Sequence, residues 1–278
     1  MNAHFDARTG TQEVTPPADD MSQLAELMQK IAQDDSLPAP APESVFVGDG
    51  DYRAIGLEYL GHYVNIGGLK PTDRVLDIGC GIGRMAVPLT QYLDPDTAFY
   101  EGVDPVNEGI EWCVQNITSD HPHFRFCRVD VAHELYNPGG MIPGREIVLP
   151  FAGAKFDFIT MVSVATHLPA DEIAAYAREV MRLLAPGGRL FLTAFLVAPE
   201  DLDRANARPR FLKGKDAGSW IADPAAPLGA IGFDAGLVES LVRRAGLDIS
   251  RISLGHWRGI ESSHYQDIII AVKPEDIA

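Results

Sequence analysis

Three glycines after a short apolar run are the residues whose spacing points most directly to ligand binding. Gly79, Gly81 and Gly83 occupy alternate positions after the apolar segment 75–78, and the segment 85–93 that follows has helical spacing. Glycine permits positive φ and lets a ligand approach the backbone closely. Strand, glycine turn and helix form the opening of a nucleotide-type βαβ unit. The alternative is a glycine turn that only packs a helix onto a strand.

The residues around these glycines indicate which ligand is held. The dinucleotide fingerprint is G-x-G-x-x-G, but here the third glycine comes one residue early, at Gly83, and Arg84 takes its place. Asp77 puts a carboxylate inside the strand just before the turn. An unpaired carboxylate at a strand end is costly, which argues against a turn that only packs a helix onto a strand. That charge repels a pyrophosphate and attracts a ligand that carries an amino group and a sulfonium.

The run from Arg74 to Arg84, with Leu-Asp-Ile-Gly-Cys-Gly-x-Gly, resembles motif I of the class I S-adenosylmethionine (SAM)-dependent methyltransferases. Segment 156–195, with Thr-His-Leu-Pro and Leu-Leu-Ala-Pro-Gly-Gly, resembles the matching part of a common bacterial group of that superfamily. The resemblance covers roughly residues 48–273. It implies an α/β fold with a Rossmann-like seven-stranded sheet, mostly parallel with an antiparallel last strand, and helices on both faces. It also implies SAM as cofactor and S-adenosylhomocysteine as product.

Several further residues fall where this family binds SAM. Asp104 ends the second expected strand and is predicted to accept ribose hydroxyls; because Pro105 follows, a helix N-cap is the alternative. Asp130 ends the third strand and is expected to accept the adenine amino group, with Val131 supplying a backbone N–H. The predicted cofactor set is Asp77, Gly79, Cys80, Gly81, Gly83, Arg84, Asp104, Pro105, Asp130, Val131, Ser163, Tyr52 and Arg53.

Tyr52 and Arg53 enter this set because the segment before the first strand often covers the SAM site in the family. Arg53 is the candidate for the ligand carboxylate. A helix cap and a surface arginine are the alternative for this pair.

The carboxyl end of the fourth expected strand, 155–163, is where the transferred methyl group should lie. Methyl transfer is an in-line displacement, so the protein supplies positioning and, for a hydroxyl acceptor, a group that takes the proton. His167 follows this strand and titrates near neutrality. We predict it as the catalytic base, with His256 and His264 as the next candidates. A histidine that caps or packs the next helix is the alternative for His167. Segment 163–166 offers no carboxylate cluster for a metal ion, so the reaction is predicted to be metal-independent.

The acceptor site is expected near the last two strands, 247–254 and 265–273, which in the family form an antiparallel hairpin with its tip on the ligand side. The turn between them is rich in residues that recognise polar, sugar-like or carboxylated molecules, namely His256, Trp257, Arg258 and His264. Insertions at 132–151 and 199–231 are expected to shape the pocket. The second carries a basic island that either binds an anionic group or is a solvated loop.

We therefore expect O-methylation of a sugar-containing or secondary metabolite. N-methylation and a non-catalytic SAM-binding role are the alternatives, and an NAD(P) dehydrogenase is the least favoured.

The elements that must position these residues fit one domain, 46–278, preceded by a flexible N-terminal arm, 1–45, with a short helix at 21–33. The arm is either dispensable, a dimer contact or a flap over the cofactor. A net charge of −16 argues against nucleic acid as a partner. Three cysteines without C-x-x-C spacing indicate reduced thiols in a cytoplasmic protein. No apolar run reaches ~18 residues, so no membrane span is expected. A small-molecule acceptor is the expected partner, and a homo-oligomer is compatible with the sequence.

Overall fold

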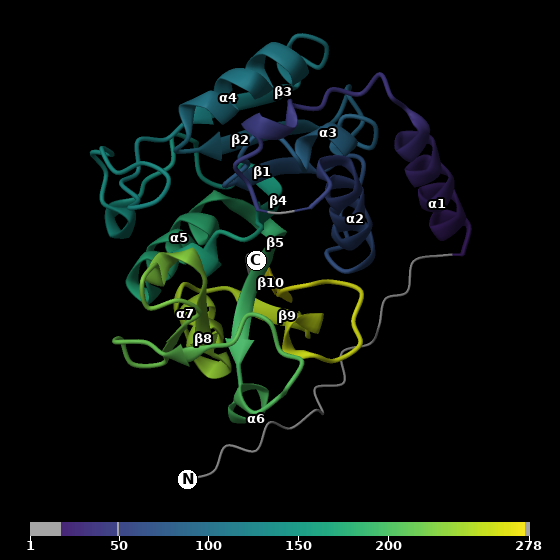
Figure 1. The fold of residues 1–278 in the computed structure, drawn as a ribbon. Helices are drawn as coiled ribbons and strands as arrows, with labels where there is room; N and C mark the ends of the chain where they lie inside the picture. The colour runs from purple at the N-terminus through teal and green to yellow at the C-terminus, as the bar shows by residue number, and fades with distance from the viewer. Residues whose placement is uncertain (1–17, 49, 276–278) are drawn as a thin grey trace.

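A central sheet with helices on both faces forms the body of the computed structural model, which describes residues 18–48 and 50–275 (Figure 1). Helix α1 (Ala18–Gln33) contains the helix expected near the N-terminus. Residues 1–17 of the expected flexible arm lie outside the described residues. Ile31 and Leu37 are buried in the same apolar cluster as Tyr59 of the domain. This part of the arm therefore shares a core with the domain.

The central sheet has the expected seven strands in the order β3-β2-β1-β4-β5-β10-β9. The first five pair in parallel, and β10 is antiparallel to both β5 and β9. This confirms the predicted Rossmann-like architecture. The strands are β1 (Arg74–Ile78), β2 (Phe99–Asp104), β3 (Phe124–Arg128), β4 (Phe156–Met161), β5 (Leu184–Val197), β9 (Asp248–Ser253) and β10 (Asp267–Val272).

The second insertion adds strands that the sequence did not predict. β6 (Leu212–Lys213), β7 (Ser219–Ile221) and β8 (Ile231–Asp234) form a small ladder, and β8 pairs in parallel with the end of β5. The physical reason is the length of β5. Its pairing with β4 ends at Leu192 and its pairing with β10 ends at Ala194, which leaves its last three residues to pair with β8.

The helices divide between the two faces of the sheet according to the alternation of side chains along each strand. In β1, Val75 packs in the cluster that contains Tyr63 of α2, whereas Leu76 packs in the cluster that contains Val180 of α5. Within the described ranges, no helix is long and apolar enough to cross a lipid bilayer. The helices after α1 are α2 (Tyr52–Asn65), α3 (Ala86–Leu89), α4 (Asn107–Cys113), α5 (Ala170–Leu183), α6 (Pro199–Leu202) and α7 (Ala235–Arg244).

Candidate active site

The glycine turn joins β1 to α3 and is tied to the end of β2. Gly79, Gly81 and Gly83 have φ values of +80°, +55° and +75°, a region that residues with a side chain rarely adopt. The N–H groups of Gly79 and Cys80 both donate to the carbonyl oxygen of Val103, at 2.8 and 3.1 Å. The turn is therefore held open as a backbone cradle at the carboxyl end of the parallel strands, where ligands bind in such sheets.

Two valines cover this turn and leave no room for a side chain on it. A Cβ atom at Gly81 would lie 2.4 Å from Cγ1 of Val47, and one at Gly79 would lie 2.4 Å from Cγ2 of Val164. Val47 belongs to the segment before α2, and Val164 follows β4. Segments from before β1 and after β4 thus each contact the predicted ligand-binding turn.

Asp104 at the end of β2 is bound to the glycine turn directly. Its Oδ2 accepts the Gly81 N–H at 2.8 Å, and its Oδ1 accepts the Val106 N–H at 2.8 Å. The side chain is buried, and burial raises the pKa of Asp104 to about 6. Each carboxylate oxygen has a second lone pair, so the residue can hold the chain ahead of α4 and also accept hydroxyl groups of a ligand.

Asp77 lies below the turn in the interior. It is 2% exposed, its Oδ2 accepts the Tyr100 hydroxyl at 2.5 Å, and burial raises its pKa to about 7. The Tyr100 bond supplies the partner that a carboxylate within a buried strand requires. Its contact with a ligand stays a prediction.

Arg84 is a buried cation without an acidic partner. Its Nη2 donates to the carbonyl oxygen of Gly48 at 3.0 Å, while Nε is buried with no partner. Among the described residues, no carboxylate forms an ion pair with this guanidinium. Burial lowers the pKa of Arg84. A guanidinium that lies beside a backbone cradle and lacks an ion-pair partner among the described residues fits the carboxylate of an amino-acid-like ligand.

Tyr52 and Arg53, which the sequence paired, are engaged in different places. The Tyr52 hydroxyl donates to the carbonyl oxygen of Ile82 in the glycine turn at 2.9 Å. Arg53 instead donates to three backbone carbonyls just beyond α1, those of Asp34, Asp35 and Leu37, at 2.7, 3.2 and 2.6 Å. Its predicted role at the ligand carboxylate is therefore not supported, because its guanidinium holds the end of α1.

The predicted adenine corner is occupied by the first insertion. Asp130 accepts from Nδ2 of Asn137 at 3.0 Å and from Arg128 at 2.9 Å, and these bonds, with Asn137 the larger cause, lower its pKa. The Val131 N–H, predicted to bind adenine, donates instead to the carbonyl oxygen of Val129 at 2.8 Å. Asn137 was missed by sequence reasoning, although its Asn-Pro-Gly-Gly run marks it as a turn residue. Nearby, the carbonyl oxygen of Pro105 accepts from Arg128 at 3.1 Å.

A cavity of about 440 Å³ lies beside the glycine turn. Ile82, which follows Gly81, and Val106, two residues after Asp104, contribute to its wall. The volume of the cavity is ordinary for a small-molecule site. Its other lining residues are Ser44, Phe46, Glu108 and Trp112.

His167 lies where the two insertions meet. Its Nδ1 is 2.8 Å from the carbonyl oxygen of Leu228 in the second insertion, and its Nε2 is 3.4 Å from the hydroxyl of Tyr136 in the first. His133 of the first insertion bonds through Nε2 to the His167 carbonyl oxygen at 3.0 Å. Burial lowers the pKa of His167. His133 and Tyr136 were not predicted from the sequence.

Residues 23–252 match a protein family described as a methyltransferase domain. The chain belongs to this methyltransferase family. SAM is therefore its cofactor, and the residues present fit it: a positive-φ glycine cradle, a buried carboxylate with open lone pairs, and a buried guanidinium with an unpaired Nε.

Curated relatives agree with this assignment, and a solved structure shares the fold. The chain is 26% identical over 179 residues to a sterol 24-C-methyltransferase of Gibberella zeae, covering 63% of this chain and 41% of that protein. It is 28% identical over 131 residues to the 27-O-demethylrifamycin SV methyltransferase of Amycolatopsis mediterranei, covering 47% and 42%. A SAM-dependent methyltransferase structure from Methanosarcina mazei shares the fold with a TM-score of 0.51 and 21% identity, covering 78% of this chain and 98% of that one. The chain spans less than half the length of the first curated relatives that it matches.

The hairpin residues predicted to bind the acceptor of the methyltransferase lie mostly in the interior. Trp257 and Arg258, in the 3₁₀ turn His256–Arg258, are 2% and 5% exposed. Trp257 donates through Nε1 to Asp267 at 2.9 Å, and Arg258 bonds to Asp267 at 2.6 Å and to Asp201 at 3.0 Å. An acceptor could reach neither side chain without breaking these bonds. We therefore assign both to the framework that holds the hairpin.

The two remaining histidines of this predicted set are separated. His264 is buried, with Nδ1 bonded to the carbonyl oxygen of Gln266 at 2.7 Å and Nε2 bonded to the Ser253 hydroxyl at 2.8 Å. His256 is exposed at the hairpin tip and lies against the Tyr265 ring. Of the four, only His256 presents its side chain to solvent.

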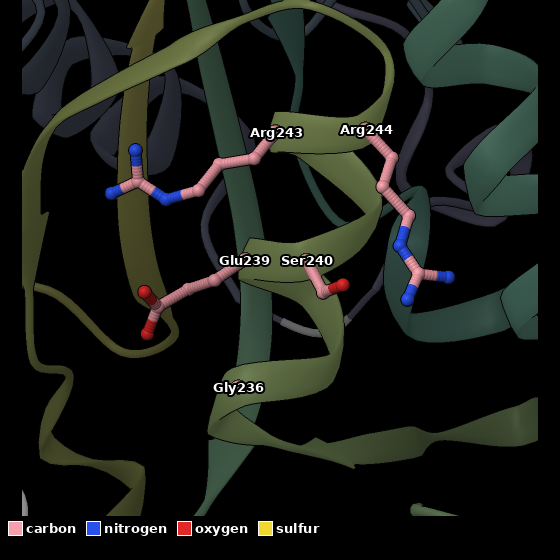
Figure 2. Close-up of a pocket in the computed structure, with 5 residues that line it drawn as sticks. All are labelled: Gly236, Glu239, Ser240, Arg243 and Arg244. Carbon is pink, nitrogen blue, oxygen red and sulfur yellow. The ribbon is translucent and has the colours of Figure 1, made fainter.

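A second cavity of the methyltransferase, about 430 Å³, lies on α7. Figure 2 shows Glu239 and Arg243 directed to one side of this helix and Arg244 to the other. The cavity contains none of the predicted site residues.

Proposed function

We propose that this methyltransferase transfers the methyl group of SAM to a hydroxyl of a small-molecule acceptor, a sugar-containing or secondary metabolite, and that His167 takes the proton. One observation carries this proposal. A carbonyl oxygen only accepts hydrogen bonds, so the bond to Leu228 requires the proton of His167 on Nδ1 and leaves the lone pair on Nε2. The lowered pKa keeps the ring neutral near pH 7, which is the state that a general base needs.

The groups around His167 support it in this role. His133 accepts the backbone N–H groups of Leu135 and Tyr136 at Nδ1, so its proton is on Nε2 and is donated to the His167 carbonyl oxygen. Burial raises the pKa of Tyr136, so its hydroxyl keeps its proton beside the free Nε2. An acceptor hydroxyl that replaced Tyr136 at this nitrogen would find a base that is already oriented. We accordingly infer that both insertions shape the acceptor pocket.

The proposed cofactor contacts follow the open groups of the site. Arg84 would bind the carboxylate of SAM, and Asp104 would accept hydrogen bonds from its ribose hydroxyls. The backbone of the glycine turn would lie against the ligand. When bound, SAM supplies an electrophilic methyl group and a neutral thioether leaving group. The reaction needs no further electrophile, and we propose that it proceeds without a metal ion.

The acceptor atom can be tested with pairs of compounds that differ only there. Purified enzyme and methyl-labelled SAM are incubated with phenols and sugars, each matched with its amino analogue. Labelled product from the hydroxyl compounds alone is expected, because a neutral histidine serves a hydroxyl acceptor that must lose its proton during transfer. Labelling of the amines alone would contradict O-methylation and indicate N-methylation instead.

The base is tested on whichever acceptor is labelled. His167→Ala should lower kcat by roughly 10²- to 10⁴-fold, the usual contribution of a general base. His121→Ala is the matched control, because this histidine lies just before β3, at the edge of the sheet opposite to the carboxyl ends of the parallel strands, and its kcat should stay near that of the wild type. A His167→Ala enzyme with unchanged kcat would reject His167 as the base.

A further inference from the structure

Ser163 has a backbone conformation that its residue type disfavours. Its φ is +58°, and it is one of two non-glycine residues with positive φ in the described part of the chain. A side chain in this left-handed region is strained, and such strain persists only where neighbouring groups enforce it. Ser163 follows β4 at the edge of the sheet that carries the glycine turn. The strain therefore lies at the ligand side of the sheet.

A closed ring of hydrogen bonds enforces this conformation. The Ser163 N–H donates to Oγ1 of Thr193 at 2.8 Å, and the Thr193 hydroxyl donates to Oε1 of Gln266 at 2.5 Å. The Ser163 hydroxyl donates to the same Oε1 at 3.2 Å, which closes the ring. Thr193 is fully buried in β5, and Gln266, just before β10, is 8% exposed. Bonds in such a buried chain strengthen one another.

The ring fixes a turn with one end on the cofactor cradle and the other on the candidate base. Val164 lies against Gly79, as the 2.4 Å approach of its Cγ2 to a Cβ built there shows. The Thr166 hydroxyl donates to the Ser163 carbonyl oxygen at 3.0 Å, and the His167 N–H donates to that of Val164 at 3.0 Å. Any relaxation at Ser163 would therefore move both Val164 and His167.

We propose that Thr193 and Gln266 are positioning residues that hold Ser163 in its left-handed conformation and so preorganise the turn 163–167 for SAM. Neither residue was singled out by the sequence, and neither needs to touch the cofactor. The inference rests on the proposed binding of SAM at this edge of the sheet, with the contact predicted for Ser163 from the sequence, and not on the acceptor. Preorganisation of this kind raises affinity because the bound conformation is already populated before the ligand arrives.

The test is calorimetric titration of the full chain with SAM in the absence of any acceptor, so its outcome does not depend on whether His167 is the base. Thr193→Val keeps the shape of the side chain and removes the hydroxyl, whereas Thr193→Ser keeps the hydroxyl. Loss of a buried hydrogen bond of this kind corresponds to a rise of roughly 5- to 100-fold in Kd for Thr193→Val. Thr193→Ser should bind SAM clearly more tightly than Thr193→Val. Equal Kd values for these two variants would overturn the proposal.

A second comparison isolates the strain itself. Ser163→Ala and Ser163→Gly both lose the hydroxyl, but only alanine keeps a Cβ at positive φ. Glycine should therefore give the lower Kd of the two, and the ratio between them should grow when Thr193→Val is added, because the ring no longer holds the strained residue. A ratio of the Ser163→Ala and Ser163→Gly Kd values that is the same with Thr193 and with Thr193→Val would also overturn the proposal. If the valine variant does not fold, Gln266→Met takes its place, because it removes the acceptor that closes the ring, and an alanine-to-glycine ratio that this substitution leaves unchanged refutes the proposal.

Discussion

Arg258→Met removes the cation of a buried three-membered ion network and tests whether Arg258 belongs to the framework. Nη1 of Arg258 lies 3.0 Å from Oδ2 of Asp201, and Nη2 lies 2.6 Å from Oδ1 of Asp267 and 3.1 Å from the carbonyl oxygen of Leu196. Asp201 and Asp267 are 3% and 0% exposed. Methionine fills a similar volume but leaves both carboxylates without this partner. Breaking a buried pair in this way costs about 3–5 kcal/mol.

Urea denaturation and thermal unfolding of the purified chain measure this cost. For 278 residues the entropy of unfolding near 60 °C is about 0.6 kcal/mol per kelvin, so a loss of about 3–5 kcal/mol lowers Tm by about 5–9 °C. Arg204→Met is the matched control, because Arg204 pairs with the same Asp201 at 3.4 Å but its side chain is 42% exposed. Removal of this exposed cation leaves the buried Asp201 paired with Arg258, so the cost should be no more than that of a solvent-exposed pair, about 0–1 kcal/mol.

Arg258 is not part of the framework if Arg258→Met costs less than about 1 kcal/mol, the level expected of the exposed control, or if the two variants are equally destabilised. A normal Tm together with a raised KM for the acceptor would restore the role that the sequence suggested for Arg258.

Two further predictions concern the cofactor cradle. The pKa of Asp104 is about 6 in the fold against an ordinary 3.8, so the folded state binds more protons between these values; its contribution to stability is present below pH 3.8 and is lost as the pH rises through about 6. Asp104→Asn should flatten that part of the curve of unfolding free energy against pH, and an unchanged slope would contradict the assignment. Gly81→Ala should raise the Kd for SAM at least about tenfold in calorimetry, because φ is +55° and a Cβ would lie 2.4 Å from Val47. Gly139→Ala is its control, since a Cβ there meets nothing within 4 Å, and equal affinities for the two would remove the steric argument.

The central fold could be predicted because its signals are local. Strands β1, β4 and β5 each contain an apolar run, β2 and β3 mix apolar with charged residues over a short stretch, and the glycine turn reveals where β1 ends. Strands β6 to β8 could not be predicted, because they are two to four residues long and form only where β5 extends past its other partners. Their existence depends on a length difference between strands that no local pattern encodes.

Side-chain roles were predictable only where the motif itself fixes the contact. Asp104 bonds to Gly81 across 23 positions because both belong to the same βαβ unit. Arg53 and Arg84 were harder to separate, since their partners depend on how the segment before β1 folds back on the domain. Thr193 and Gln266 are 30 and 103 positions from Ser163 in the chain, and their meeting at one point follows from the strand order alone.

One signal in the sequence was overlooked. Asp267 begins an apolar strand, as Asp77 lies within one, and the same cost of a buried carboxylate applies to both. A buried Asp267 requires a nearby cation and hydrogen-bond donors. Arg258 and Trp257, nine and ten residues away in the chain, were the candidates. The many polar residues in this turn thus indicated first the partners of a buried carboxylate and only second a site for the methyl acceptor.

The pairing of buried charges separates framework from site in this molecule, because Arg258 is paired with two carboxylates and Arg84 with none among the described residues. Asp267 has a guanidinium, an indole N–H and two backbone N–H donors, from Gly255 and Leu196, so nothing remains to be supplied by a ligand. Asp104 has two backbone donors and no cation, and Arg84 has a backbone acceptor and no carboxylate. Asp104 and Arg84 both flank the glycine turn. Asp104 can still accept hydrogen bonds, and Arg84 can still pair with an anion. A ligand that brings hydroxyl donors and a carboxylate together satisfies both at once, which is why SAM should stabilise this fold as well as react in it.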